Sequence, residues 1–427
     1  MRPGVIATHC GDWVEPAAVF EAYCRGSTTA FWLDSGQNAA SGMSYLGTSE
    51  RTVIETISDG QVREPESGHR HSGTIFDFLR SQDVDVEPGV GAGSFQLGWV
   101  GWLGYELHTH TLKAVPPRHS RYPDAALMFV DRAIAFDHVN RRVLLVTLGE
   151  SDEIQSWREG AASIIDDCRR PGASPAAQMG HEVTLVSWAC SDAEYLERIV
   201  ACQRSIANGD VYQLCLTMQA EVAVTPDPLD TYLALRALSP THHGGYIRIG
   251  DVSLLSASPE QFLTVTSDGE IESRPIKGTR RRGTSEHTDA ALRDELLTSE
   301  KERAENLMIV DLMRNDIGRV SEVGSVSVPA LLDIESYAQV HQLVSTVRGT
   351  LARGVGGVDA VEACFPAGSM TGAPKYSAVA LLDALERAPR GIYSGAFGYF
   401  GLDGRIELAM VIRSIVLDPD GATIGSG

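Results

Sequence analysis

Short apolar runs rich in branched residues recur along the chain, and they constrain the fold more than any other feature. Ala126–Val130 and Arg142–Leu148 are two clear examples, each bounded by turn-forming residues. Their length and their bounds are typical of buried strands. Similar strand-like pieces cover residues 211–218, 246–256 and 261–266. The sequence therefore predicts buried strands in both halves of the chain.

Helical periodicity is confined to a few longer segments. Residues 191–208 begin at Ser191, a residue type that caps helices, and carry apolar residues at helical spacing. A further helix has Pro374 near its first turn and extends to about Arg387. The longest helical pattern covers about 285–317, and its apolar side consists of Leu292, Leu296, Ala304, Leu307, Met308 and Leu312.

A stretch rich in Pro, Gly, Ser and Ala over residues 169–178 indicates a surface linker. We predict an amino-terminal region over 1–168, a linker over 169–184 and a catalytic domain over 185–427. Because 427 residues exceed what one simple core usually supports, we expect two intertwined subdomains or one large composite domain.

The formal net charge of −20 argues against nucleic acid as a partner, because no basic stripe offsets the acidic background. The cluster Arg280–Arg282 is too short to provide one. An acidic enzyme that acts on an acidic substrate must overcome its own long-range field. Local cations or a bound metal ion are therefore needed at its site.

Seven cysteines are scattered without a close pair or a Cys-x-x-C motif, which indicates reduced, mostly buried thiols and a cytoplasmic protein. The first ten residues lack an apolar core of signal-peptide length. No apolar run reaches the roughly 18 residues that a membrane span requires, so we expect no membrane segment. The cysteines are Cys10, Cys24, Cys168, Cys190, Cys202, Cys215 and Cys364.

The segment Arg274–Gly283 contains the residue of greatest chemical interest. Lys277 stands between Pro275 and Gly278 at the end of an extended run. Such a placement can fix an amine at a turn beside a pocket, where burial and adjacent cations lower its pKa and make it a nucleophile. Taken alone, the segment also fits a solvated basic turn.

Several further segments resemble, in order, the motif set of the chorismate-utilising enzymes, and among them most closely the aminodeoxychorismate synthases. The resemblance runs from about residue 190 to the last residue, with weaker matches in the first half. It implies an α+β fold, an α/β sandwich of large antiparallel sheets with outer helices. The matching segments are Gly209–Gln213, Pro275–Thr279, Ala304–Val320, Phe365–Lys375 and Gly391–Gly395, with Phe31–Gly36 and Gly98–Glu106 upstream.

Two positions distinguish among the reactions of this family. Lys277 stands where anthranilate synthases usually carry alanine, and the resemblance implies that it is the covalent nucleophile of aminodeoxychorismate synthases. Gln213 stands where isochorismate and salicylate synthases carry a water-activating lysine. A neutral amide cannot act as that base. Both positions indicate amination at the para position of the ring.

The resemblance also implies an acid and a metal site. Glu260 matches the general acid that protonates the leaving hydroxyl, although on its own it fits a surface residue at a strand end. Glu305 matches a magnesium ligand that also holds the ring carboxylate of the substrate, and Glu302 is the weaker candidate. On its own the pair fits a solvated acidic helix face, because residues three apart share a face. We therefore expect Mg²⁺ as a cofactor.

Further positions match substrate contacts of the family. Arg413 lies in an apolar run over 408–416, and a buried arginine needs an anionic partner. The resemblance assigns it the enolpyruvyl carboxylate, together with Tyr393, and the alternative is an internal salt bridge. His341 matches a position close to the substrate, although a lone histidine beside a strand is more often structural. The remaining predicted contacts are Gln213, Thr279, Ser369, Gly372 and Gly427.

The chain departs from the family pattern at its end. It stops at Gly425–Gly427, inside what resembles the family's last glycine-rich turn, before a second metal-binding glutamate pair and a substrate-facing lysine. We expect this gap to weaken magnesium binding. Asp34 and Ser35 fall where relatives have an effector or structural tryptophan site, and no function is assigned to them.

These observations predict the large component of an aminodeoxychorismate synthase, which converts chorismate and ammonia to 4-amino-4-deoxychorismate for 4-aminobenzoate and folate synthesis. No glutaminase domain is recognisable in these residues. Ammonia is therefore expected from a separate glutamine amidotransferase subunit or from solution. The alternatives are an anthranilate or 2-amino-2-deoxyisochorismate synthase component, and a truncated subunit that binds chorismate without catalysis.

Overall fold

Two large antiparallel sheets form the centre of the molecule. The computed structural model describes residues 4–37, 39–82, 86–170, 186–337 and 339–427. Within these residues the first sheet has 11 strands. In spatial order they are β1 (Val5–Asp12), β10 (Arg142–Leu148), β9 (Arg132–Asp137), β3 (Met43–Thr48), β2 (Thr29–Asp34), β14 (His243–Ile249), β15 (Val252–Ser258), β24 (Ser414–Asp418), β25 (Gly421–Ser426), β13 (Met218–Val222) and β11 (Val186–Trp188).

The second sheet has 12 strands within the same residues. Their path is β18 (Ile276–Arg281), β20 (Val340–Thr350), β17 (Glu270–Ser273), β16 (Gln261–Val265), β23 (Ile406–Met410), β22 (Ala396–Gly401), β7 (Gly98–Leu103), β8 (Ala125–Val130), β4 (Thr52–Thr56), β5 (Gln61–Arg63) and β6 (Arg70–His71), and β19 (Ser327–Ser336) also pairs with β20. A short separate ladder joins β12 (Gln213–Leu214) to β21 (Gly372–Ala373).

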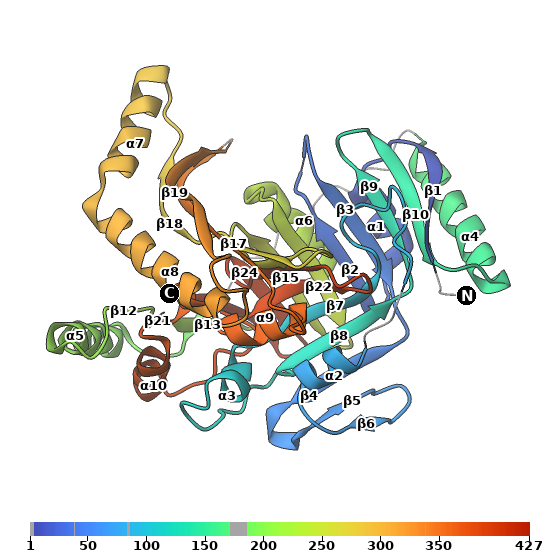
Figure 1. Cartoon of the computed structure of the whole chain (residues 1–427). Helices are drawn as coiled ribbons and strands as arrows, with labels where there is room; N and C mark the ends of the chain where they lie inside the picture. The colour runs from blue at the N-terminus through green and yellow to red at the C-terminus, as the bar shows by residue number, and fades with distance from the viewer. Residues whose placement is uncertain (1–3, 38, 83–85, 171–185, 338) are drawn as a thin grey trace.

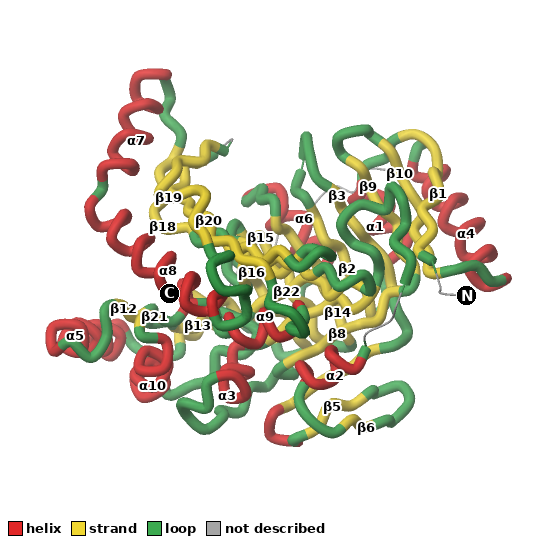
Figure 2. The backbone as a smooth tube through the Cα atoms, in the orientation of Figure 1, coloured by secondary structure: helices red, strands yellow, loops and turns green. Residues whose placement is uncertain are grey.

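Helices cover the outer faces of both sheets (Figures 1 and 2). One layer of apolar contacts joins the first sheet to α1, α4 and α6, and another joins the second sheet to α2, α8 and α9. The order is therefore helices, sheet, sheet, helices. The helices are α1 (Pro16–Cys24), α2 (Ile75–Ser81), α3 (His108–Thr111), α4 (Asp152–Cys168), α5 (Asp192–Asn208), α6 (Pro228–Leu238), α7 (Glu286–Thr298), α8 (Glu300–Gly318), α9 (Gly357–Cys364) and α10 (Lys375–Glu386).

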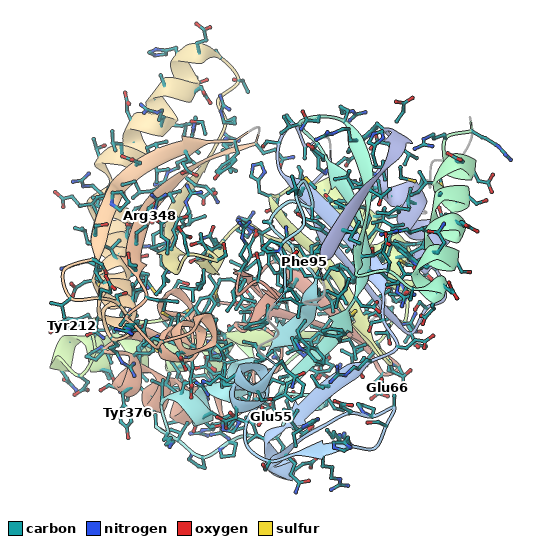
Figure 3. The ribbon with its side chains drawn as sticks, turned by 45° about the vertical axis from the view of Figure 1, so that its right-hand side comes forward. Glu55, Glu66, Phe95, Tyr212, Arg348 and Tyr376 are labelled. Atoms are coloured by element: carbon teal, nitrogen blue, oxygen red, sulfur yellow. The ribbon has the colours of Figure 1, made fainter. Side chains whose placement is uncertain are left out.

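The apolar layer between the two sheets is closed by aromatic contacts. Phe95, labelled in Figure 3, is fully buried there. Its ring packs against Phe31 and Tyr45 of the first sheet and against Tyr399 of the second. Aromatic pairs of this kind stabilise the packing by more than the burial of their surface area alone. The predicted sandwich of antiparallel sheets with outer helices is therefore confirmed.

Both sheets combine strands from the two sides of the predicted linker. In the first sheet β2 pairs with β14, and in the second β7 pairs with β22. The two halves consequently share one core. Apart from Arg169 and Arg170, the predicted linker lies outside the described residues.

Some predicted elements are confirmed closely. Helix α5 begins after Ser191, whose side chain accepts from the Glu194 N–H while Glu194 bonds back to the Ser191 N–H. This reciprocal capping box satisfies two backbone donors and fixes the helix start. Pro374 is the N-cap of α10, and that helix ends before Arg387.

Three predicted elements are wrong in extent. The single helix over 285–317 is two helices, because Ser299 ends α7 in extended conformation and caps α8 by accepting from the Glu302 N–H. A serine that binds the backbone in this way competes with a continuous helix. The strand over 211–218 is also divided, into β12 and the start of β13. The strand over 246–256 is an antiparallel hairpin of β14 and β15, because the chain turns at Gly250 and Asp251.

Among the described residues, no helix has the length and apolarity that a membrane crossing requires. All seven cysteines are free thiols, and four of them are buried: Cys24, Cys190, Cys202 and Cys364.

Candidate active site

Lys277 lies on β18 with its amine directed at the turn that precedes β21. Its Nζ donates a hydrogen bond to the backbone oxygen of Ser369 at 3.3 Å, and the side chain is half-buried. Among the described residues it has no carboxylate partner within ion-pair distance. Lys375 contrasts with it, because its Nζ is 2.5 Å from Asp316 Oδ2 and 2.7 Å from the Cys364 oxygen. Of these two lysines, only Lys375 is neutralised by a carboxylate among the described residues.

Glu260 is buried beside Lys277, although it stands at the start of a strand. Its side chain is only 8% exposed, between the end of β15 and the start of β16. Burial raises the pKa of the Glu260 carboxyl, while the charge of Lys277 and hydrogen bonds from the Ser369 side chain and the Ile276 backbone lower it. A carboxyl group with a raised pKa retains a proton that it can donate.

Ser369 joins these two groups. It lies in the short 3₁₀ helix η3 (Gly368–Met370) and is 5% exposed. Its backbone oxygen accepts from Lys277, and its side chain bonds Glu260. The structure therefore brings together Lys277, Glu260 and Ser369, three of the residues predicted from the sequence.

Gly372 and Gln213 form the ladder beside this turn. An added Cβ at Gly372 would lie 2.1 Å from the Gln213 backbone oxygen, and the φ angle there is +147°. Only glycine allows this approach. The Gln213 Oε1 atom is buried and has no hydrogen-bond partner among the described residues. Tyr212, the preceding residue, is 70% exposed and lies at the outer edge of the molecule (Figure 3).

Helix α8 is fixed against β18 by a buried amide. Asn306 Nδ2 is 3.4 Å from the backbone oxygens of both Pro275 and Leu343, and its Oδ1 accepts from Ser345 Oγ at 2.5 Å. Pro275 is two residues before Lys277. The helix that carries the predicted metal ligands is thus tied to β20 and to the residue that precedes β18, the strand of the predicted nucleophile.

The two predicted metal ligands are half-buried on α8, and each lies near a cation. Glu302 Oε1 is 3.6 Å from Arg280 Nη1, and Glu305 Oε1 is 3.8 Å from Lys301 Nζ. No group of three His, Cys, Asp or Glu side chains suited to a metal ion occurs in the described part of the chain. Two carboxylates nevertheless fit Mg²⁺, which often takes one or two from a protein and fills the rest with waters and substrate oxygens.

Arg413 does not occupy the buried strand position predicted for it. The apolar run over 408–416 crosses from β23 in one sheet to β24 in the other, and Arg413 lies exposed in the bend between them with a φ angle of +49°. It lines a cavity of about 250 Å³ together with Pro259 and Gln342. Its side chain needs no internal anion, because it faces this open space.

Thr279 lies farther along β18, and His341 lies on the neighbouring strand β20. His341 is buried, with Nε2 3.0 Å from Asp289 Oδ1 and Nδ1 2.7 Å from Ser336 Oγ. Both ring nitrogens are therefore engaged, Nε2 in joining α7 to the sheet and Nδ1 in joining β19 to β20. Thr279 pairs with Gln342 and is exposed.

Tyr393, another predicted substrate contact, packs against the glycines near residue 427. Tyr393 is 6% exposed, and an added Cβ at Gly425 would lie 2.1 Å from its ring. An added Cβ at Gly427 would lie 3.4 Å from Cys215 Sγ. Gly425 of β25 thus packs against Tyr393, and Gly427, which follows β25, packs against Cys215.

Three residues of this region were missed by sequence reasoning: Asn306, Cys215 and Arg390. Asn306 lies inside the matching segment Ala304–Val320, and Arg390 precedes the segment Gly391–Gly395. The structural role of each becomes visible only from its burial in the folded chain. Burial raises the pKa of the Cys215 thiol, against the opposing charges of Arg390 and Lys277. Arg390 is 3% exposed. The reasoning about a buried arginine was applied to Arg413, whereas it holds for Arg390.

A larger cavity of about 380 Å³ lies between the sheets and is lined by Asp34 and Ser35, but not by Lys277. The Asp34 carboxylate is already satisfied by Arg236, Tyr232 and the Gly36 N–H. No function follows from these contacts.

Comparison with known proteins identifies the family. Residues 28–427 match the family model described as chorismate binding enzyme. The chain is 45% identical to an aminodeoxychorismate synthase of Streptomyces griseus, over 100% of this chain and 61% of that protein. It is 40% identical to an aminodeoxychorismate synthase of Streptomyces pristinaespiralis, over 96% of this chain and 59% of that one.

A solved structure agrees with this match. Anthranilate synthase component I from Streptococcus pneumoniae TIGR4 has a TM-score of 0.77 and 26% identity, covering 92% of this chain and 88% of that one. The chain belongs to the chorismate binding enzyme family. It spans about three fifths of the length of the two aminodeoxychorismate synthases.

Gly278 provides a test of how tightly α7 and α8 are held against β18. An added Cβ there would lie 2.7 Å from Leu296 Cδ1 and 3.0 Å from Glu302 Cγ, at a φ angle of +84°. We expect Gly278→Ala to lower the free energy of unfolding by about 1–3 kcal/mol beyond the cost of the left-handed backbone, because the site is overpacked.

Gly250→Ala is the matched control, because Gly250 has a φ angle of +62° and nothing within 4 Å. It should cost roughly 1–2 kcal/mol through the backbone alone. Denaturant unfolding compares the two variants. Equal losses in the free energy of unfolding would show that neither α7 nor α8 packs tightly against this strand.

Proposed function

We propose that this chain is the chorismate-converting part of an aminodeoxychorismate synthase, which replaces the C4 hydroxyl of chorismate with an amino group. The observation that carries the proposal is the amine of Lys277, which lies beside the buried Glu260 and bonds the Ser369 turn. The identity of 45% to a relative named aminodeoxychorismate synthase supports the same reaction.

The proposed reaction has two displacements. The Lys277 nitrogen bonds to ring C2, the ring double bonds shift, and the C4 oxygen leaves as water with a proton from Glu260. Ammonia then bonds to C4, the double bonds shift back, and the lysine nitrogen leaves C2. The net change is chorismate plus ammonia to 4-amino-4-deoxychorismate plus water. Splitting one substitution into two easier ones is the advantage of a covalent intermediate.

Magnesium is part of this proposal. A bound Mg²⁺ would be held by Glu305, with Glu302 as the weaker ligand, and would neutralise the ring carboxylate of the substrate. The chain's own residues then position the ring. Lys277 and Glu260 act on it from β18 and from the start of β16, and Tyr393 and Arg413 are proposed for the enolpyruvyl carboxylate.

The ammonia source is proposed to be a glutamine amidotransferase that acts with this chain. Gln213 supports ammonia over water as the second nucleophile, because an amide cannot remove a proton from water. The proposed product would serve 4-aminobenzoate synthesis.

The main rival is an anthranilate synthase, because one of the matching structures is component I of that enzyme. The full-length protein should be incubated with chorismate, magnesium and ammonium, with and without a lyase that removes pyruvate from 4-amino-4-deoxychorismate. We expect 4-aminobenzoate only when the lyase is present. Anthranilate fluorescence without the lyase would reject the proposed function.

Replacing Lys277 tests the covalent step. Lys277→Ala should lose most activity with glutamine as donor, because the nitrogen that bonds to C2 is gone. Lys277→Arg is the control for charge, since a guanidinium remains protonated and is not a nucleophile. It should be as inactive as Lys277→Ala by chromatographic product assay. Activity in either variant equal to that of the wild type would refute the covalent role.

The pH dependence tests the acid. Glu260 must be protonated to donate, so the first step should slow as pH rises through the pKa of Glu260. Ser369→Ala removes a hydrogen bond that stabilises the charged carboxylate but keeps the backbone oxygen that Lys277 contacts. The pKa of Glu260 should therefore rise further, and the decline should move to higher pH.

This shift is measured from the rate at which the covalent adduct with chorismate forms, recorded over a range of pH in the absence of ammonia. Ser285→Ala, which affects only the cap of α7, should leave the profile unchanged. A decline that moves to lower pH in Ser369→Ala would contradict the assignment of Glu260 as the acid.

A further inference from the structure

A buried arginine lies behind the active site and contacts two of its segments. Arg390 follows α10 and is 3% exposed. Its Nη1 donates to the Met370 oxygen at 2.6 Å, and its Nη2 donates to the Cys215 oxygen at 2.9 Å. These two carbonyls belong to segments more than 150 residues apart in the sequence. One guanidinium therefore bridges the two segments, which the β12–β21 ladder also joins.

Both segments belong to the proposed catalytic apparatus. Met370 follows Ser369, whose backbone oxygen bonds Lys277 and whose side chain bonds Glu260. Cys215 follows β12, the strand of Gln213, and its N–H donates to the Thr371 oxygen at 2.8 Å. Arg390 itself touches neither Lys277 nor Glu260. Any influence on them passes through the turn at Ser369.

The guanidinium is held firmly from its other side. Glu386 accepts from Nε at 2.9 Å and from Nη2 at 2.7 Å, and the same carboxylate accepts from the Thr217 N–H at 2.8 Å. The Tyr105 ring lies 4.3 Å from the guanidinium carbon. A planar group with its donors fixed in this way is preorganised.

The backbone of Arg390 is anchored as well. Its N–H donates to Glu106 Oε1 at 2.7 Å, and the Gly391 N–H donates to Glu106 Oε2 at 2.9 Å. Glu106 comes from the first half of the chain. The arginine thus cannot shift without moving a buried carboxylate from the other half.

We propose that Arg390 is a positioning residue of the reaction, which holds the Ser369 turn and the Cys215 segment at the spacing that aligns Lys277 with Glu260. The inference rests on the proposed function, because it assigns a task in that reaction. Lysine could not replace Arg390, because an ammonium is a compact point charge that cannot reach both carbonyls and Glu386 in the plane of a guanidinium.

The test is Arg390→Lys, which keeps a positive charge beside Glu386. We expect a folded protein whose kcat falls by about 10²-fold, the effect of a misplacement of about 1 Å, while the KM for chorismate changes little. Arg390→Ala should be less active still. Guanidinium ion in the assay should restore part of its activity by filling the vacated space.

Arg118→Lys is the matched control. Arg118 also binds helix α10 through its guanidinium, which donates to Asp383 Oδ2 at 2.9 Å and to the Asp383 backbone oxygen at 3.0 Å. Within the described residues it donates no hydrogen bond to the Ser369 turn or to the Cys215 segment. It should lower the melting temperature without changing kcat, and guanidinium should not affect it.

Three results would overturn the inference. The first is a folded Arg390→Lys protein with the kcat of the wild type. The second is an Arg118→Lys protein that has the same melting temperature as Arg390→Lys and loses as much kcat. The third is a loss of kcat/KM in Arg390→Lys that comes entirely from a higher KM. If Arg390→Ala does not fold, Arg390→Lys decides alone. The role of Arg390 is judged from the ratio of the kcat values of variant and wild type, whichever product forms. A wild-type product other than 4-amino-4-deoxychorismate would reject the proposed function, and the kcat ratio would still test the role of Arg390.

Discussion

The rest of the structure depends on the face-to-face packing of two antiparallel sheets that each contain strands from both halves of the chain. The pairing of β2 with β14 and of β7 with β22 places Glu106 from the first half directly behind Arg390 from the second. Non-local pairing of this kind must form before the site exists. The active site is consequently a product of the whole core and not of one segment.

Burial within this core changes the protonation of the carboxyl group that we propose as the acid. Glu260 is shielded from water at the start of β16, where a carboxyl group retains its proton more readily than in solvent. Lys277 lies beside it without a carboxylate partner among the described residues, whereas Lys375 is neutralised by Asp316. The same fold therefore gives Lys375 a structural role, whereas Lys277 is the lysine that we propose for bond formation. Asn306 and Arg390 hold the surrounding segments in place.

Local signals in the sequence predicted the elements that depend on local interactions. The cap at Ser191, the proline at the start of α10 and the branched runs of β8 and β10 are examples. Ser299 was missed because a serine inside a helical pattern becomes a cap only when the chain turns there. The proposed nucleophile Lys277 and the proposed acid Glu260 were predicted from their resemblance to family motifs, and the structure places the two residues beside the same turn.

The arginines show why the remainder could not be predicted. An apolar neighbourhood in the sequence suggested that Arg413 is buried, but that run crosses between two sheets and exposes it. Arg390 stands among turn residues and is buried because Glu386, Tyr105 and two carbonyls converge on it from distant segments. Burial of a long polar side chain is set by tertiary contacts, which local composition does not report.

The central claim is that the nitrogen of Lys277 bonds to carbon. The most direct measurement is a peptide mass map of the full-length protein after incubation with chorismate and magnesium in the absence of ammonia. We predict one modified peptide, which contains Lys277 and is heavier by chorismate less water, and the modification should disappear when ammonium is added. Modification of another residue, or turnover on adding ammonium to protein that carries no adduct at Lys277, would contradict the account.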